Sequence, residues 1–145
     1  MTCDLRWIVK SDHIFDYAIV EAHHQIEKLL DEIYVDSSDA ESKAEIFLAD
    51  SEDLEALEEK INQLNTGQLD PLTFETVYDP KERLLSDMRL LRSGRWEAYY
   101  MLNENEKTCT GVLAFRRDQI NEMQLHDRLS ELINKSSITI TNKEL

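Results

Sequence analysis

Four arginines around a glycine-containing turn are the residues of this chain best suited to chemistry. Arg92 and Arg95 lie on either side of Gly94, and Arg116 and Arg117 end a later apolar run. A guanidinium group presents a planar fork of donors that suits a phosphate or a carboxylate. Glycine lets the backbone turn tightly and approach a ligand closely. The pattern therefore predicts an anion-binding site built from neighbouring strand ends.

A catalytic site of this kind also needs a group that transfers protons. Tyr99 and Tyr100 follow the glycine turn, and a tyrosine hydroxyl can fill that role. Two plainer interpretations remain open. The tyrosines pack in a half-buried strand, and the arginines neutralise carboxylates in surface pairs that contribute little stability. Trp7 and Trp96 are predicted to pack in the core.

A hairpin is predicted to position these residues. Segments 96–102 and 108–115 are rich in aromatic and β-branched residues, which favours strands. The polar residues 103–107 between them are typical of a turn.

The segments beside this hairpin are predicted in outline. An alternating run at 72–77 indicates a strand, which Pro80 ends. Segment 81–92 fits either a helix or a strand. Apolar residues recur at helical spacing over 118–134, and 136–141 fits a last edge strand.

The first half of the chain is predicted to contain one strand and two helices. The run 5–10 alternates as a strand does, and 13–34 follows helical spacing. The short apolar run 44–49 fits a helical turn or an edge strand. A second helix is predicted over 52–65, with Asp50 or the serine after it as its cap.

Residues 90–100, a polar turn and residues 111–118 together resemble the RelE/ParE superfamily of toxins. The shared pattern is a Leu-Arg-x-Gly-x-Trp strand and a later apolar strand that ends in Arg-Arg-Asp. The resemblance covers about residues 80–120. It implies an α+β fold, in which N-terminal helices pack on a small antiparallel sheet and a C-terminal helix follows.

The same resemblance implies a member of a toxin–antitoxin module. Such a protein acts on translation, by cleaving messenger RNA, or on gyrase, and an antitoxin neutralises it. Carried over position by position, the catalytic residues would be Arg95, Arg116, Arg117 and Tyr100. The substrate-binding residues would be Arg92 and Gly94.

The chain departs from the family pattern at two positions. Phe115 stands where many relatives carry a histidine, and Glu97 stands where the strand is often basic. The usual proton-transfer residue of a ribonuclease is therefore missing from its place. A gyrase-directed relative, or a degenerate member kept only as a scaffold, needs no such residue.

The net charge suggests a second function class. The chain carries 30 acidic and 16 basic residues, a formal net charge of −14. This charge favours solubility and disfavours direct nucleic-acid or ribosome binding. It also fits a non-enzymatic acidic inhibitor, an immunity protein or a phage counter-defence protein that binds a basic protein partner. The partner-binding residues would then be Glu52, Glu55 and Glu59.

The remaining composition predicts one domain over 1–145 in a reducing, cytoplasmic setting. No secretory signal and no run long enough to span a bilayer is visible. Cys3 and Cys109 fit no metal or redox motif and are predicted to be free thiols. The neighbouring His23 and His24 would point about 100° apart on a helix, so we predict no metal site and no cofactor.

Overall fold

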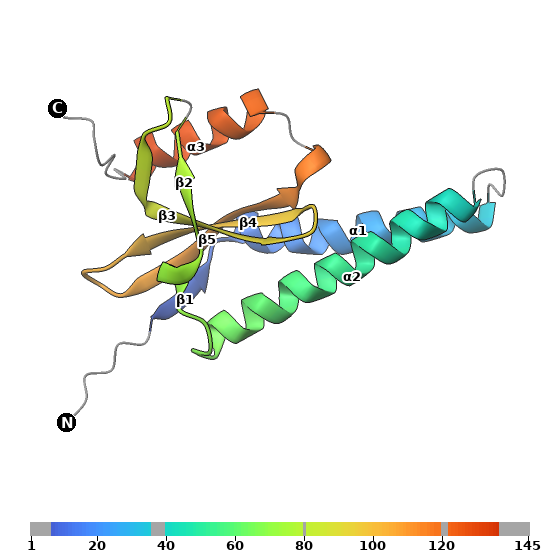
Figure 1. Ribbon diagram of the computed structural model, residues 1–145, viewed down its shortest axis with the longest axis horizontal. Helices are drawn as coiled ribbons and strands as arrows, with labels where there is room; N and C mark the ends of the chain where they lie inside the picture. Colours follow the sequence, from blue (N-terminus) through green and yellow to red (C-terminus); the bar gives the residue numbers. More distant parts are fainter. Residues whose placement is uncertain (1–6, 36–39, 80, 120–121, 137–145) are drawn as a thin grey trace.

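The computed structural model describes residues 7–35, 40–79, 81–119 and 122–136 of the 145-residue chain. Within these ranges the chain forms five strands, three α-helices and two short 3-10 turns (Figure 1). In chain order the elements are β1 (Ile8–Ser11), α1 (His13–Val35), α2 (Ala40–Asn65), a 3-10 turn (Pro71–Thr73), β2 (Glu75–Tyr78), β3 (Leu84–Ser93), β4 (Trp96–Asn103), β5 (Thr108–Arg116), a second 3-10 turn (Arg117–Gln119) and α3 (Glu122–Ser136).

The strands form one mixed sheet with the order β1-β5-β4-β3-β2. Strands β2 to β5 are antiparallel neighbours in a meander, but β1 runs parallel to β5. The prediction of a purely antiparallel sheet was therefore wrong at one edge. Parallel neighbours need a long connection, and β1 is separated from the meander by the whole α1–α2 hairpin.

Helices cover both faces of the sheet. Helices α1 and α2 pack on one face around Phe15, Leu54 and Trp96, while α3 packs on the other face through Leu125 and Leu129. The alternation of side chains along β4 explains this division, because successive residues of a strand point to opposite faces. Figure 1 shows the two long helices together on one side of the sheet and α3 on the other.

Most elements predicted from periodicity are present. The first helix covers the predicted range, and β4 and β5 form the predicted hairpin. The ambiguous segment 81–92 forms β3. The run predicted as a strand at 72–77 begins as a 3-10 turn, in which the Asp70 side chain accepts a hydrogen bond from the Leu72 amide at 3.0 Å.

The start of α2 was predicted too late. The helix begins at Ala40, so the run 44–49 is helical and Asp50 lies inside the helix and not at its cap. No glycine or proline interrupts this stretch, and its acidic residues tolerate helical conformation. The last helix begins at Glu122 and not at 118, after the second 3-10 turn.

Two predictions fall partly outside the described residues. The first strand was expected from residue 5, but the described part of it begins at Ile8. The edge strand expected at 136–141 begins at a residue that is helical, and the rest lies outside the described ranges. None of the helices in the described part of the chain is long and apolar enough to cross a bilayer.

Candidate functional site

Arg95 and Arg116 converge on one buried carboxylate. Asp50 is only 1% exposed, and its two oxygens accept hydrogen bonds from Arg95 Nη2 and Arg116 Nη1, each at 2.7 Å. Helix α2 supplies Asp50, while the two arginines lie at the β3–β4 turn and at the end of β5. The Trp96 indole donates to the backbone carbonyl of Asp50 at 3.0 Å. This set therefore ties α2 to the sheet.

Asp118 completes the set at the surface. Its carboxylate accepts from Arg95 at 3.2 Å and from Arg116 Nε at 2.7 Å. The Arg116 guanidinium also lies 5.8 Å from the centre of the Trp96 ring, a distance suited to a cation–π contact. We call Asp50, Arg95, Arg116 and Asp118 the Asp50 cluster.

Gly94 is needed beside the Asp50 cluster. Its φ of +56° lies in the left-handed region that side chains disfavour. A β-carbon added there would collide with the Asp53 side chain of α2. Glycine at this position thus permits both the turn and the close approach of the helix.

The other two arginines lie on the opposite face of the sheet. Glu97 is 1% exposed, and it accepts from Arg92 Nη1 at 3.0 Å and from Arg117 Nη1 at 3.3 Å. Arg92 also forms a two-pronged pair with Glu75, at 2.9 and 3.0 Å. We call Glu75, Arg92, Glu97 and Arg117 the Glu97 cluster. The two clusters separate the four arginines that the sequence grouped together.

Carboxylate pairing favours the charged forms of Arg92 and Arg95. Hydrogen bonding to Glu75 and the charge of Glu97 raise the pKa of Arg92, although burial opposes the shift. Hydrogen bonding to Asp50 raises the pKa of Arg95 in the same way. A phosphate that bound here would have to displace carboxylates already in contact. The arrangement is thus suited to cross-linking elements and less suited to an open anion site.

The two tyrosines lie on opposite faces. The Tyr99 hydroxyl is 3.4 Å from Glu97 Oε1, and burial with the nearby Glu97 charge raises its pKa. Tyr100 points into the helical face and makes ring contacts with Phe15 at 5.4 Å and with Phe74 at 6.3 Å. Burial likewise raises its pKa. Tyr100, predicted as catalytic, lies four residues along β4 from Trp96 and opposite Arg89 of β3, and its described ring contacts are with Phe15 and Phe74.

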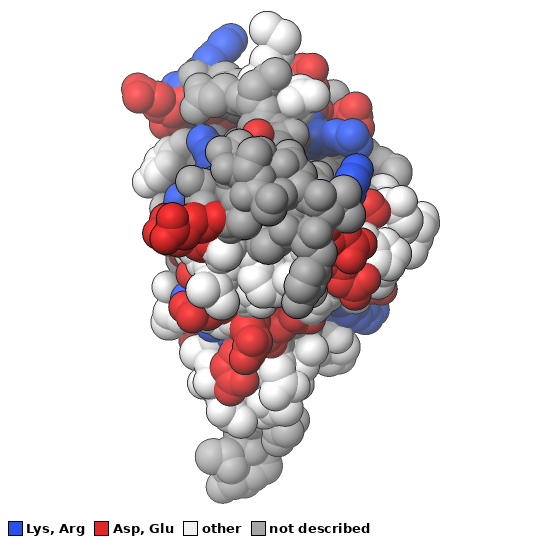
Figure 2. Space-filling model, turned by 90° about the vertical axis from the view of Figure 1, so that its right-hand side faces the viewer, with Lys and Arg blue, Asp and Glu red and all other residues white. Residues whose placement is uncertain are grey.

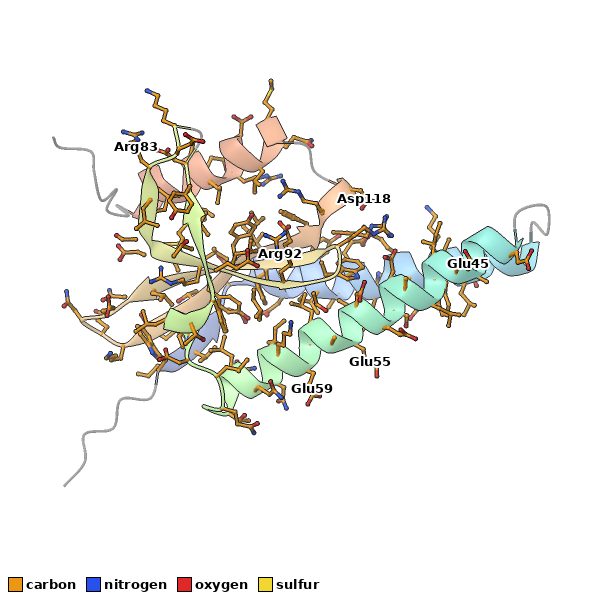
Figure 3. The ribbon with its side chains drawn as sticks, viewed as in Figure 1. Glu45, Glu55, Glu59, Arg83, Arg92 and Asp118 are labelled. Atoms are coloured by element: carbon orange, nitrogen blue, oxygen red, sulfur yellow. The ribbon has the colours of Figure 1, made fainter. Side chains whose placement is uncertain are left out.

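An acidic surface on α2 accounts for the predicted partner-binding residues. Glu52, Glu55 and Glu59 are exposed and follow one another at helical spacing, so they share a face. Figure 3 shows Glu55 and Glu59 on the side of α2 that faces away from the sheet. No described Lys, Arg or His side chain forms an ion pair with these three glutamates, whereas the neighbouring Glu58 lies 2.9 Å from His23. We call these three residues the α2 acidic face.

Figure 2 looks onto the end of the α1–α2 hairpin and shows acidic surface on both sides of it. Blue lysine and arginine surface is sparser in this view. The described surface around this end is therefore mainly acidic, in keeping with the formal net charge of −14.

Sequence reasoning identified the arginines but missed their partners. Asp50 falls between Phe47 and Leu54 on the buried side of α2, a single acid among apolar positions of one face. Glu97 and Tyr99 lie two residues apart on β4 and point to the same face of the sheet, the face that α3 covers. A charged residue at a position whose spacing predicts burial requires a partner, and that signal could have identified both.

No group of three or more metal-ligating side chains occurs among the residues that the structure describes. His23 and His24 each lie beside a glutamate, at 2.9 Å from Glu58 and 3.9 Å from Glu21. Comparison of the chain with protein-family models, with curated proteins and with solved structures gave no match.

Proposed function

We propose that this chain is a non-enzymatic binding protein that uses the α2 acidic face to bind a basic protein partner. One contrast carries the proposal. The four arginines that could have formed a basic site are paired with carboxylates, two of which are buried. The three glutamates of the α2 acidic face have no described cationic partner and are exposed to solvent.

The geometry of α2 suits this role. The helix has 26 residues, a length of about 39 Å at 1.5 Å per residue. Glu52 and Glu59 are separated by about 10 Å along the axis, which spans two helical turns. A row of Lys and Arg side chains on a partner can match this spacing. The overall negative charge raises the association rate and makes binding sensitive to salt.

A charge-removal experiment tests the proposal. The full chain is immobilised and exposed to a lysate at low ionic strength, and the captured basic proteins are identified. Each captured protein is then purified, and its dissociation constant is measured at several salt concentrations. The triple variant Glu52→Gln, Glu55→Gln, Glu59→Gln should lose most of this binding. The matched triple Glu82→Gln, Glu104→Gln, Glu106→Gln removes three other exposed carboxylates and should retain it. Equal loss in both triples, or no basic partner at low salt, would contradict the proposal.

A RelE/ParE-like toxin is the second candidate, and the Glu97 cluster favours it. Arg92 and Arg117 keep 45% and 44% of their side chains exposed while contacting Glu97, and the Tyr99 hydroxyl is adjacent. The exposed parts of the two guanidinium groups can stabilise the charge of a phosphoryl transition state, and the buried Glu97, 1% exposed, holds both in place. The partner in this case would be an antitoxin.

Expression of the chain alone separates the two candidates. A toxin should arrest growth on induction. The variant Arg92→Lys, Arg117→Lys preserves charge and should relieve the arrest; Arg95 and Arg116 are left unchanged because both are paired with the buried Asp50, so their loss would also lower stability. Normal growth at an expression level confirmed by immunoblot would reject the toxin candidate and leave the binding protein unaffected.

A further inference from the structure

The outer edge of β5 is only half covered. Strand β1 pairs with β5 from Thr108 to Gly111. The last described hydrogen bond on this edge runs from the Asp12 amide to the Gly111 carbonyl, at 3.0 Å, and the chain then turns away into α1. No strand of the described chain lies beside residues 112–115 on this edge. The backbone of a strand edge is a template for pairing with another chain.

This open edge forms the floor of a groove between two helices. The groove has a volume of about 570 Å³ and contains Leu113, Ala114 and Phe115. Ile14 and Tyr17 of α1 line one wall. Both are unusually exposed for apolar side chains, at 48% and 68%. Residues of α3 form the opposite wall. Figure 1 shows this helix on the other face of the sheet from α1.

The walls of the groove differ in chemistry. The α1 wall is mainly apolar near the start of the helix, where Ile14 and Tyr17 lie, and it carries Glu21 one turn later. The α3 wall carries Asp127 and Glu131 together with Arg128. Three carboxylates against one guanidinium give the groove a negative balance.

We propose that this groove binds an extended basic segment of a partner protein, which adds as a strand beside β5 in line with β1. Four residues of open edge correspond to about 13 Å of extended chain. Side chains of a strand alternate between faces, so apolar residues of the segment contact Ile14 and Tyr17 while lysine or arginine residues approach Asp127 and Glu131. Backbone pairing supplies affinity, and the alternating side chains supply specificity.

This site is separate from the α2 acidic face and does not rest on the function proposed above. The groove is lined by α1, β4, β5 and α3 but by no residue of α2. Charge reversal can therefore be placed at either surface independently.

Nuclear magnetic resonance of the full, ¹⁵N-labelled chain tests the proposal. The probe is a blocked synthetic nonapeptide in which lysine and valine alternate. Titration should shift the amide resonances of residues 112–115. It should slow hydrogen exchange by at least about tenfold at those amides of this stretch that point to the open edge, because only these gain new backbone hydrogen bonds. A peptide with glutamate in place of lysine, and a lysine–valine peptide with alternate backbone nitrogens methylated, should each bind at least about fivefold more weakly.

Matched variants locate the binding. Tyr17→Ala and the double variant Asp127→Lys, Glu131→Lys change exposed side chains and should each raise the dissociation constant at least about fivefold. The control Glu55→Lys, Glu59→Lys reverses the same amount of charge on α2 and should change the dissociation constant less than about twofold. Shifts confined to α2, equal binding of the methylated peptide, or equal loss in the control would overturn the proposal.

Discussion

The buried carboxylate of Asp50 gives the sharpest test of how the helical layer is held to the sheet. Asparagine at this position keeps the side-chain volume but removes the charge, and its amide nitrogen can only donate. Arg95 and Arg116 donate to different oxygens of Asp50, so in the variant one of them would face the amide nitrogen, which cannot accept. The Trp96 indole bond is retained, because its acceptor is the Asp50 backbone carbonyl.

The magnitude follows from burial. Removing one partner of a buried ion pair costs about 3–5 kcal/mol. The side chains of Arg95 and Arg116 are 46% and 22% exposed, and Asp118 still contacts both. We therefore expect Asp50→Asn to lower the free energy of unfolding by about 2–3 kcal/mol, below the full range. For a chain of this size that corresponds to a fall in Tm of about 5–10 °C.

Urea unfolding followed by circular dichroism measures this difference, with an unchanged slope m expected for a change in stability alone. The matched control is Asp118→Asn, which removes a carboxylate from the same two arginines but at a position 48% exposed. It should cost less than about 1 kcal/mol. If the two variants were equally destabilised, or if Asp50→Asn were neutral, the reasoning from burial would be refuted.

Three further predictions concern other parts of the fold. Gly94→Ala combines a left-handed φ with a collision against Asp53 and should cost about 1–3 kcal/mol by the same urea assay, whereas a gain in stability would contradict the described turn. Burial alone would raise the pKa of Asp79, but hydrogen bonds from Arg83 and Lys81 lower it overall. The stabilising contribution of the Asp79 carboxylate should be present above pH about 4 and be lost as pH falls through the lowered pKa. Asp79→Asn should therefore flatten the acid side of a stability–pH curve, and an unchanged slope would count against this reasoning. Burial raises the pKa of the Cys109 thiol to about 12. In a Cys3→Ser background, a thiol reagent at pH 8 should therefore modify Cys109 only as fast as the protein unfolds. Rapid modification of the native protein would show that the thiol is accessible.

Periodicity predicted the elements whose signal is local. Helix α1 and the β4–β5 hairpin carry regular apolar spacing with polar residues between segments, and both are present as expected. The start of α2 carried no such signal, since residues 40–51 are acidic and only partly apolar. Its helical state is supported by packing of Phe47 against the core and by the Asp50 pairs with the sheet.

Long-range pairing could not be read from single segments. The parallel placement of β1 depends on where β5 lies after three intervening strands, and no residue of either strand specifies that neighbour. The same holds for the arginines. Their grouping in the sequence was clear, but Arg116 ends β5 and Arg117 begins the 3-10 turn, and the two side chains contact different carboxylates on opposite faces of the sheet.

The pairing of β1 with β5 has a consequence for synthesis of the chain. Ile8 pairs with Thr108, so the ribosome must add 100 further residues before this edge of the sheet can form. At 5–20 residues per second this takes about 5–20 s. During that interval the apolar side of the α1–α2 hairpin has no sheet to cover it. The carboxylates along α2 then repel other copies of this acidic chain and oppose their aggregation until the meander is complete.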